Sequence, residues 1–381
     1  MVTSSRADYG HLKGLMQEIH EDPDLQLQVA VTGMHLSQRF GSTYHQIQKD
    51  GFSIIKTPPL LIYPDTEQGI AKTIGRGCEL FAQLYKKIKP DLVVVFGDRY
   101  EMFAAATAAY VAKIPIAHLH GGESSEGAFD EAFRHAITKM SHFHFPATEV
   151  YRQRILKMGE NPHHVFCYGS PGLDAIRRIK FLSRSELSLA LRFDLTGHMA
   201  IVTYHPVTLE KESPVKQVRN LLKAISHFDL KAIFTQANAD THGQIINLTL
   251  QQFCRRDPQR YKFIPNLGQE RYLSCLKHFD LMIGNSSSGI VEAPSFRLPV
   301  VNIGNRQKGR VKAKNIIDVG YGEEDIRKGI RKALSPLFRK RIQNTKNPYQ
   351  RYLDGKTGQR IKEILKKAPL NSGLLLKRFN Y

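Results

Sequence analysis

The chain of 381 residues contains no tryptophan, only four cysteines and no long hydrophobic run. Its longest strongly apolar stretch, at residues 92–96, has the length of a β-strand, whereas a membrane-spanning helix needs about 20 apolar residues. The N-terminus lacks the basic start and the apolar segment of a secretory signal. We therefore expect a cytoplasmic protein with no membrane partner.

The cysteines are far apart and form no C-x-x-C pair: Cys78, Cys167, Cys254 and Cys275. This spacing disfavours a zinc knuckle or a disulfide framework and indicates free structural thiols. The sequence also lacks a Walker A motif, and no G-x-G-x-x-G follows a predicted strand. A P-loop NTPase and a simple NAD enzyme are disfavoured for this reason, and we expect no cofactor and no metal.

The net charge of +20 is concentrated in the last quarter of the chain. Residues 297–381 carry 22 Lys and Arg against 6 Asp and Glu. Most of these cations fall on helical patterns such as DIRKGIRKAL and are typical of a solvated helix face. A nucleic-acid or anionic-surface module is the alternative, but the sequence shows no zinc-finger spacing and no RNP-like aromatic motif, so we expect no nucleic-acid partner.

Short apolar runs recur along the chain, with helical patterns such as 101–112 and 215–227 between them. Runs of Val, Ile, Leu and Phe without strict alternation are typical of strands buried on both faces of a parallel sheet. The predicted strands are 25–31, 92–96, 114–119, 143–146 and 165–168, followed by 200–204, 231–235, 261–264, 281–283 and 300–303. The fold class is α/β, with two Rossmann-like domains at residues 1–170 and 171–346. The Gly and Pro of GSPGLDAIRR (169–178) predict a hinge at their boundary. Only Met1 and Val2 precede the first loop, so the first strand is a stub or the chain starts inside a longer one.

Polar loops follow the predicted strands in both domains. In open α/β sheets, ligands bind where loops and helix N-termini meet at the carboxyl ends of the strands. The sequence therefore predicts a ligand cleft lined from both domains. The loops in question are TSSR (3–6), GDR (97–99), HLHGGE (118–123), TYHP (203–206) and GNSSSG (284–289).

The loop GNSSSG leads into an apparent helix and predicts an anion site suited to a diphosphate. Ser286 and Ser287 offer hydroxyls, and Glu292, about two turns into the helix, could accept from ribose hydroxyls. Arg306 and Arg310 after the next strand would add charged donors to phosphate. The plain alternative is a serine-capped helix with no ligand.

A set of acidic residues follows the strands of the first domain: Asp98, Glu123, Asp130 and Glu131, with His135 nearby. Carboxyl groups of unequal pKa in a water-poor cleft suit proton transfer at a sugar carbon. In the alternative interpretation, Asp130, Glu131 and Arg134 form only a charge cluster at a helix start. A metal site at His118 and His120 is a weaker possibility, because alternate strand residues share one face.

Taken together, these stretches resemble the hydrolysing UDP-N-acetylglucosamine 2-epimerases of sialic-acid and related nonulosonate pathways. The similarity covers nearly the whole chain, and the segment 118–139 is its most specific part. The matching stretches are TSSRADYG (3–10), FGDRYE (96–101), HLHGGESSEGAFDEAFRHAITKMSHFHF (118–145), YHPVT (204–208), IGNSSSGIVE (283–292) and NIGNRQKGR (302–310).

This resemblance implies a GT-B-like fold with a UDP-sugar in the cleft and a helix at about 347–367 that packs back on the first domain. It implies Asp98, Glu123 and Asp130 or Glu131 as catalytic acids. The implied sugar-nucleotide contacts are His205, Arg6, Asn285, Ser286, Ser287, Gly289, Glu292 and Arg306. Relatives of this kind are commonly dimers or tetramers, so a homodimer or homotetramer is expected.

The implied reaction has two stages. A carboxylate takes the C2 proton while the C1–O bond to UDP breaks, which leaves a glycal with a C1–C2 double bond. Water then adds, C2 is reprotonated from the opposite face, and a free manno sugar is released. The alternatives are the same reaction on the UDP-linked 2,4-diacetamido-2,4,6-trideoxy sugar of legionaminic-acid synthesis, a non-hydrolysing epimerase, and a GT-B glycosyltransferase.

Overall fold

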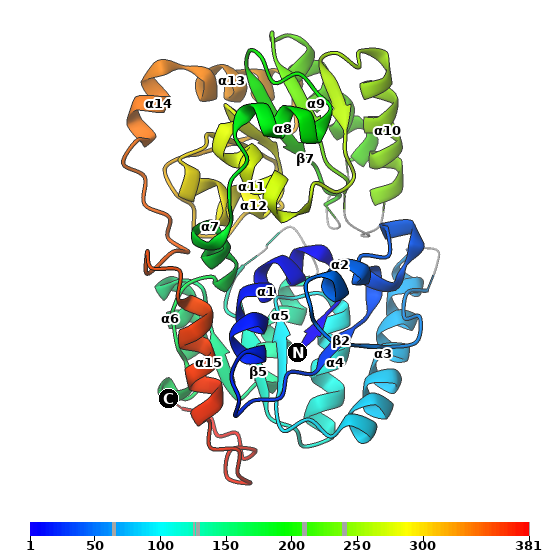
Figure 1. Ribbon diagram of the computed structural model, residues 1–381, viewed down its shortest axis with the longest axis vertical. Coiled ribbons are helices and arrows are strands. Elements are labelled where there is room, and N and C mark those ends of the chain that lie inside the picture. Colours follow the sequence, from blue (N-terminus) through cyan, green and yellow to red (C-terminus); the bar gives the residue numbers. More distant parts are fainter. Residues whose placement is uncertain (63–65, 125, 127–129, 208–211, 238–241, 381) are drawn as a thin grey trace. The chain divides into compact units, whose positions relative to one another are not determined.

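The computed structural model describes residues 1–62, 66–124, 126, 130–207, 212–237 and 242–380 (Figure 1). The chain divides into two units. The first contains Met1–Glu123, Asp130–Arg178 and Tyr349–Tyr381, and the second contains Ser124–Phe129 and Ile179–Pro348. The structure divides the chain after Arg178, the last residue of the predicted hinge segment 169–178, so the first unit continues beyond the predicted domain end at residue 170. The chain returns to the first unit at Tyr349.

The first unit contains two three-stranded parallel sheets. Their orders are β1-β2-β3, from β1 (Val2–Thr3), β2 (Val29–Val31) and β3 (Ile54–Lys56), and β4-β5-β6, from β4 (Val93–Phe96), β5 (Ile116–Leu119) and β6 (Phe143–Phe145). The α-helices are α1 (Arg6–His20), α2 (Tyr44–Lys49), α3 (Glu67–Ile88), α4 (Tyr100–Val111), α5 (Asp130–Met140), α6 (Glu149–Lys157), α7 (Ala175–Arg178) and α15 (Thr357–Lys367). Short 3₁₀ turns are η1 (Gly33–Leu36), η2 (Gln38–Phe40), η3 (Pro162–His164) and η4 (Pro171–Asp174).

Apolar side chains join these elements into two buried clusters. Val2 of the two-residue strand β1 shares a cluster with Val93 and Val95 of β4, so the two sheets share part of their core. In the other cluster, Leu12 of α1 packs with Ile361 of α15. Helix α15 therefore closes one face of the unit against α1, although it comes from the far end of the chain.

The second unit is built on one six-stranded parallel sheet in the order β12-β11-β10-β7-β8-β9. Its strands are β7 (Met199–Thr203), β8 (Lys231–Phe234), β9 (Tyr261–Phe263), β10 (Leu281–Gly284), β11 (Val300–Ile303) and β12 (Ile316–Val319). Its helices are α8 (Arg184–Leu191), α9 (Pro214–Ser226), α10 (Gly243–Arg256), α11 (Gly268–His278), α12 (Ser288–Val291), η5 (Ala293–Phe296), α13 (Glu323–Leu334) and α14 (Pro336–Ile342).

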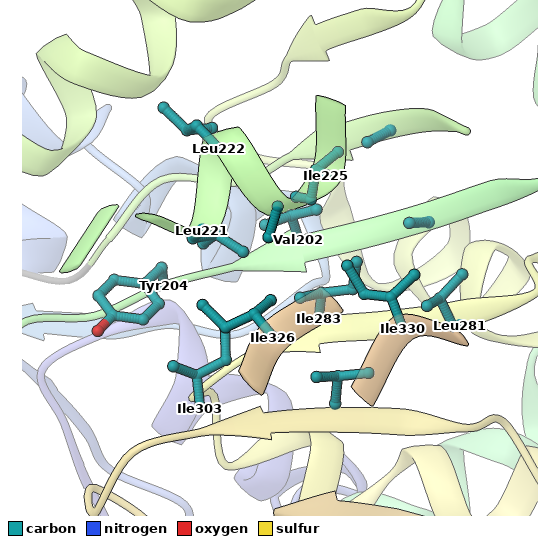
Figure 2. Packing of buried hydrophobic residues seen from close by; sticks show 14 of the residues in the cluster. Val202, Tyr204, Leu221, Leu222, Ile225, Leu281, Ile283, Ile303, Ile326 and Ile330 are labelled. Atoms are coloured by element: carbon teal, nitrogen blue, oxygen red, sulfur yellow. The ribbon is translucent and has the colours of Figure 1, made fainter. Parts of the chain in front are cut away.

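The core of the second unit lies between this sheet and the helices α9 and α13. Figure 2 shows Leu221 and Ile225 of α9 over Val202 of β7, with Ile326 and Ile330 of α13 beside Ile283. Each fully buried aliphatic side chain of this kind contributes about 1.5–3 kcal/mol. This packing fixes the carboxyl ends of β7, β10 and β11, from which the polar loops start.

Two kinds of error separate the predicted strands from those observed. The predicted strand 165–168 is wrong: only Val165 forms an isolated parallel bridge, to His144. Two strands were missed, β3 (Ile54–Lys56) and β12 (Ile316–Val319). Both are short edge strands that are only partly buried, so their apolar pattern is weak.

Among the described residues, no helix has the length and apolar character that crossing a lipid bilayer requires.

The end of the chain is held on the first unit by a buried cluster around Glu160. The Glu160 carboxylate accepts from Lys139 Nζ at 2.5 Å, Lys377 Nζ at 2.7 Å and His144 Nε2 at 3.0 Å. Lys377 Nζ also donates to the carbonyl of Ser141. Burial alone would raise the pKa of Glu160, but the hydrogen bond and charge of His144, with the two lysines, lower it to about 2.

We expect Glu160 to make the stability of the protein depend on pH below neutrality. Because its pKa is lowered from 4.5 to about 2, its contribution is present above about pH 4.5 and is lost as the pH falls towards 2. In urea unfolding at pH 7, the free energy of unfolding of Glu160→Gln should be about 1–3 kcal/mol below that of the wild type. This difference should become smaller as the pH falls through this window. Glu79→Gln, at an exposed position on α3, should follow the wild type, and a loss that does not depend on pH would contradict the assignment.

Candidate active site

Two carboxylates at the carboxyl ends of β4 and β5 are joined by one buried arginine. Asp98 follows β4 and Glu123 follows β5, and Arg134 lies on α5. One terminal nitrogen of Arg134, Nη2, forms an ion pair with the Asp98 carboxylate, and the other, Nη1, donates to Glu123 Oε2 at 3.2 Å. The side chains of Arg134 and Glu123 are each 1% exposed, whereas that of Asp98 is 23% exposed. Asp98 is therefore the carboxylate of this pair with access to solvent.

The other oxygen of Glu123 is held by His120. His120 Nδ1 lies 2.7 Å from Glu123 Oε1, and its Nε2 lies 3.0 Å from the hydroxyl of Ser170. All three side chains are buried. Glu123 is thus fixed at both oxygens, by a guanidinium on one side and an imidazole on the other.

His118 is placed as a structural histidine of β5. Its Nε2 lies 2.7 Å from the carbonyl of Gly97, and its Nδ1 lies 3.1 Å from the hydroxyl of Thr138. Complete burial lowers the pKa of His118 to about 3, so the ring is neutral at pH 7. Both ring nitrogens have hydrogen-bond partners, and the described part of the chain contains no group of three or more His, Cys, Asp or Glu residues placed to hold a metal.

Asp130 and Glu131 occupy the first turn of α5. Glu131 Oε1 lies 3.2 Å from Nε2 of His135, one turn further along the same helix. Both side chains therefore belong to the start of the helix. The residue of that charge cluster that reaches Asp98 and Glu123 is Arg134.

Arg6 is the first residue of α1, and its position is set by a helix cap. The Ser5 side chain accepts from the backbone of Asp8, whose carboxylate in turn accepts the N–H of Ser5 at 3.0 Å. Such a reciprocal cap satisfies helix N–H groups that otherwise lack partners. Arg6 itself is half-buried, and this partial burial lowers the pKa of its guanidinium.

In the second unit, the loop after β10 lies directly beside the loop after β7. Gly284 permits this approach: its φ is +134°, and a Cβ built there would lie 1.9 Å from the carbonyl oxygen of Thr203. The buried side chain of Asn285 then accepts the N–H of His205 at 2.7 Å and donates to its carbonyl at 2.8 Å. The Asn285 side-chain amide therefore holds the two loops together through the backbone of His205.

Arg306 lies at the same loop. Its Nη1 donates to the carbonyl of Asn285 at 3.2 Å, and the neighbouring Gln307 donates to the same oxygen at 2.8 Å. Ser286 Oγ accepts the N–H of Ser288 at 3.3 Å. The arrangement concentrates one guanidinium, serine hydroxyls and loop amides in one place, which is suited to an anion.

The predicted position of Glu292 two turns into a helix is wrong. Helix α12 has a single turn, Ser288–Val291, and Glu292 ends it. Pro294 follows at the start of η5, and the residue before proline is disfavoured in a continuing helix. Gly289 lies within α12, where a Cβ would approach Val300 Cγ1 to 2.9 Å, and Ser287 is the residue before the turn. Because α12 has a single turn, its dipole contributes less than the sequence predicts. The anion donors at this loop are the guanidinium, the serine hydroxyls and the loop amides.

Three residues of these sites were missed or misassigned from the sequence. Arg134 carried a signal, because it follows Asp130 at helical spacing, but nothing local indicates that it binds two carboxylates. Ser170 lies in the segment first interpreted as a hinge. Gln307 lies inside the stretch NRQKGR and could have been found beside Arg306.

The fold is similar to that of a solved sugar-nucleotide enzyme. The crystal structure of UDP-GlcNAc 2-epimerase from Neisseria meningitidis bound to UDP-GlcNAc matches with a TM-score of 0.79 at 18% identity, covering 96% of this chain and 98% of the other. At this identity the similarity shows the fold alone, which is the GT-B-like class predicted from the sequence.

The family is shown by sequence. Residues 17–366 match the model of the UDP-N-acetylglucosamine 2-epimerase family. A Campylobacter jejuni protein named GDP/UDP-N,N'-diacetylbacillosamine 2-epimerase (hydrolyzing) is 42% identical over 326 residues, 85% of each chain. A Legionella pneumophila protein named UDP-N,N'-diacetylbacillosamine 2-epimerase (hydrolyzing) is 39% identical over 99% of this chain and 97% of its own. This chain belongs to the UDP-N-acetylglucosamine 2-epimerase family, and the predicted resemblance is confirmed.

Proposed function

We propose that this chain is a hydrolysing UDP-sugar 2-epimerase that converts a UDP-2-acetamido sugar and water into UDP and the free sugar inverted at C2. In the first stage a carboxylate takes the C2 proton, the C1–O bond breaks, and UDP departs with the bonding pair. The product is a glycal with a double bond between C1 and C2. Water then adds its hydroxyl to C1, and a proton is delivered to C2 from the opposite face. Apart from the UDP-sugar, the overall reaction consumes only water.

The observation that carries the proposal is the single buried Arg134 shared by Asp98 and Glu123. Asp98 and Glu123 differ strongly in exposure, and carboxylates in different environments can take different roles at one site. We assign the exposed Asp98 to proton exchange with the substrate and the buried Glu123 to support of the charge on Arg134. Asp130 and Glu131 are proposed to assist from the start of α5.

The leaving UDP needs donors that neutralise its developing charge. We assign this role to the anion-suited loop of the second unit, with Arg306 beside it. The proposed UDP contacts are Arg6, His205, Asn285, Ser286, Ser287, Gly289, Glu292 and Arg306. We further expect a cytoplasmic homodimer or homotetramer that supplies the free manno sugar to sialic-acid or legionaminic-acid synthesis.

Two substrates are candidates. The sequence resemblance favours UDP-N-acetylglucosamine, which would yield N-acetylmannosamine. The names of the two relatives at 42% and 39% identity support the second candidate, UDP-N,N'-diacetylbacillosamine, the UDP-linked 2,4-diacetamido-2,4,6-trideoxy sugar. The two differ at C4, where an acetamido group replaces a hydroxyl, and at C6, which is a methyl group in place of a hydroxymethyl group.

Incubation of the purified protein with each UDP-sugar tests this proposal. We expect UDP and a free 2-epimerised sugar from at least one of them, and kcat/KM at least about tenfold higher for the diacetamido substrate, since a site built for one hydrogen-bonding pattern rejects the other. A UDP-linked epimer as the product would indicate the non-hydrolysing reaction. Turnover only after addition of a sugar acceptor would indicate a glycosyltransferase.

A further inference from the structure

A buried series of three side chains leads from Ser170 through His120 to Glu123. The two nitrogens of the His120 ring lie 3.0 Å from Ser170 Oγ and 2.7 Å from Glu123 Oε1. Ser170 and Glu123 are each 1% exposed, and His120 is 4% exposed. The series is therefore screened from water, so its hydrogen bonds are stronger than they would be at a surface.

The chemistry of the partners fixes which way these hydrogen bonds run. Glu123 lies against the guanidinium of Arg134, which favours its ionised form, and an ionised carboxylate can only accept. His120 must then carry a proton on Nδ1, and this N–H donates a hydrogen bond to Glu123. In the neutral imidazole this leaves Nε2 to accept the hydroxyl proton of Ser170.

The His120 ring is also held by its packing and its backbone. It lies 4.6 Å from the ring of Phe96 and 5.5 Å from that of His11, measured between centroids. The backbone φ of His120 is +61°, a left-handed conformation that most side chains avoid. Such a conformation persists only where the surroundings maintain it and is often found at functional sites.

We infer that His120 is a positioning residue for the proposed epimerase reaction, on which this inference rests. Its Nδ1–H holds Glu123 Oε1 while Arg134 holds Oε2, so the carboxylate stays ionised and fixed in direction. Glu123 in turn keeps the guanidinium directed at Asp98, the exposed carboxylate. His120 acts through Glu123 and Arg134 and does not itself contact the substrate.

The test is the replacement His120→Gly, because glycine accepts a positive φ and removes the ring. With the substrate found for the wild type, we expect kcat to fall roughly 10–100-fold, the effect of losing a hydrogen bond to a charged group, and KM to change less than about threefold. Added imidazole should restore part of kcat. The matched variant His120→Asn tolerates the same φ and keeps a donor near the position of Nδ1, so it should retain more activity than His120→Gly.

Several outcomes would overturn the inference. These are a wild-type kcat in His120→Gly, a loss confined to KM, or a loss that neither imidazole nor asparagine relieves in a variant that still melts cooperatively.

A second measurement needs no turnover. ¹⁵N NMR of the histidine-labelled protein should show a proton on His120 Nδ1, and Glu123→Gln should displace that signal, since an amide can donate where the carboxylate only accepts. An unprotonated Nδ1 in the wild type would overturn the inference. If the wild type turned over neither UDP-sugar, the proposed reaction would fail, and this spectrum alone would decide whether His120 positions Glu123.

Discussion

Replacement of Asp98 by asparagine should lower kcat by roughly 10²–10⁴-fold, the usual contribution of a general acid or base. Asparagine has almost the same size and can still hydrogen-bond to Arg134, but it cannot take up a proton from carbon. Asp98 is the member of the arginine-linked pair whose side chain is partly exposed, so the loss should fall on the chemical step. Steady-state kinetics of UDP release would measure it, with KM changed little.

The matched control is Asp91→Asn, at an exposed position just before β4. It should retain the activity of the wild type, and both variants should keep their melting temperature. Glu123→Gln is expected to cost about 10²-fold or more as well, through the loss of a charge that fixes Arg134. An Asp98→Asn enzyme within a few-fold of the wild type would remove Asp98 from the proposed chemistry.

Replacement of Arg134 by methionine should destabilise the first unit by about 3–5 kcal/mol, the range for a buried ion pair that loses one partner. Methionine replaces the apolar stem of the side chain but leaves Glu123 buried without its cation, next to Asp98. Urea unfolding followed by circular dichroism would measure the change. The effect should exceed that of an ordinary surface substitution several-fold.

Arg152→Met is the control for this experiment, because Arg152 on α6 is partly exposed and pairs with the exposed Glu149. Such a pair contributes about 0–1 kcal/mol. Adding Glu123→Gln to Arg134→Met should recover part of the lost stability, since the stranded carboxylate is then neutral. Equal losses in the two arginine variants would show that the buried cation is not what holds these carboxylates.

The sequence predicts the interior of both units well, because strands buried on two faces are nearly continuous in Val, Ile and Leu. It predicts which loops are polar, since these follow the strands directly. It does not predict the pairing of Arg134 with Asp98 and Glu123, because these residues come from different segments and meet only after β4, β5 and α5 have packed. The same holds for Ser170, which is 50 residues from His120 along the chain.

Local chemistry also limited the prediction around Glu292. The stretch SSSGIVE has the composition of a capped helix, and the sequence gives no measure of how soon the chain must turn back to reach β11. Pro294 is the residue from which the early end of this helix could have been predicted. The short strands β3 and β12 were not predicted for a different reason: they are partly buried edge strands, so their apolar pattern is weak.

The Asn285 side chain couples the motions of two loops. Because it grips both the N–H and the carbonyl of His205, neither loop can swing outward alone without stranding a buried amide, at a cost of roughly 1–3 kcal/mol. The two loops are therefore expected to move together.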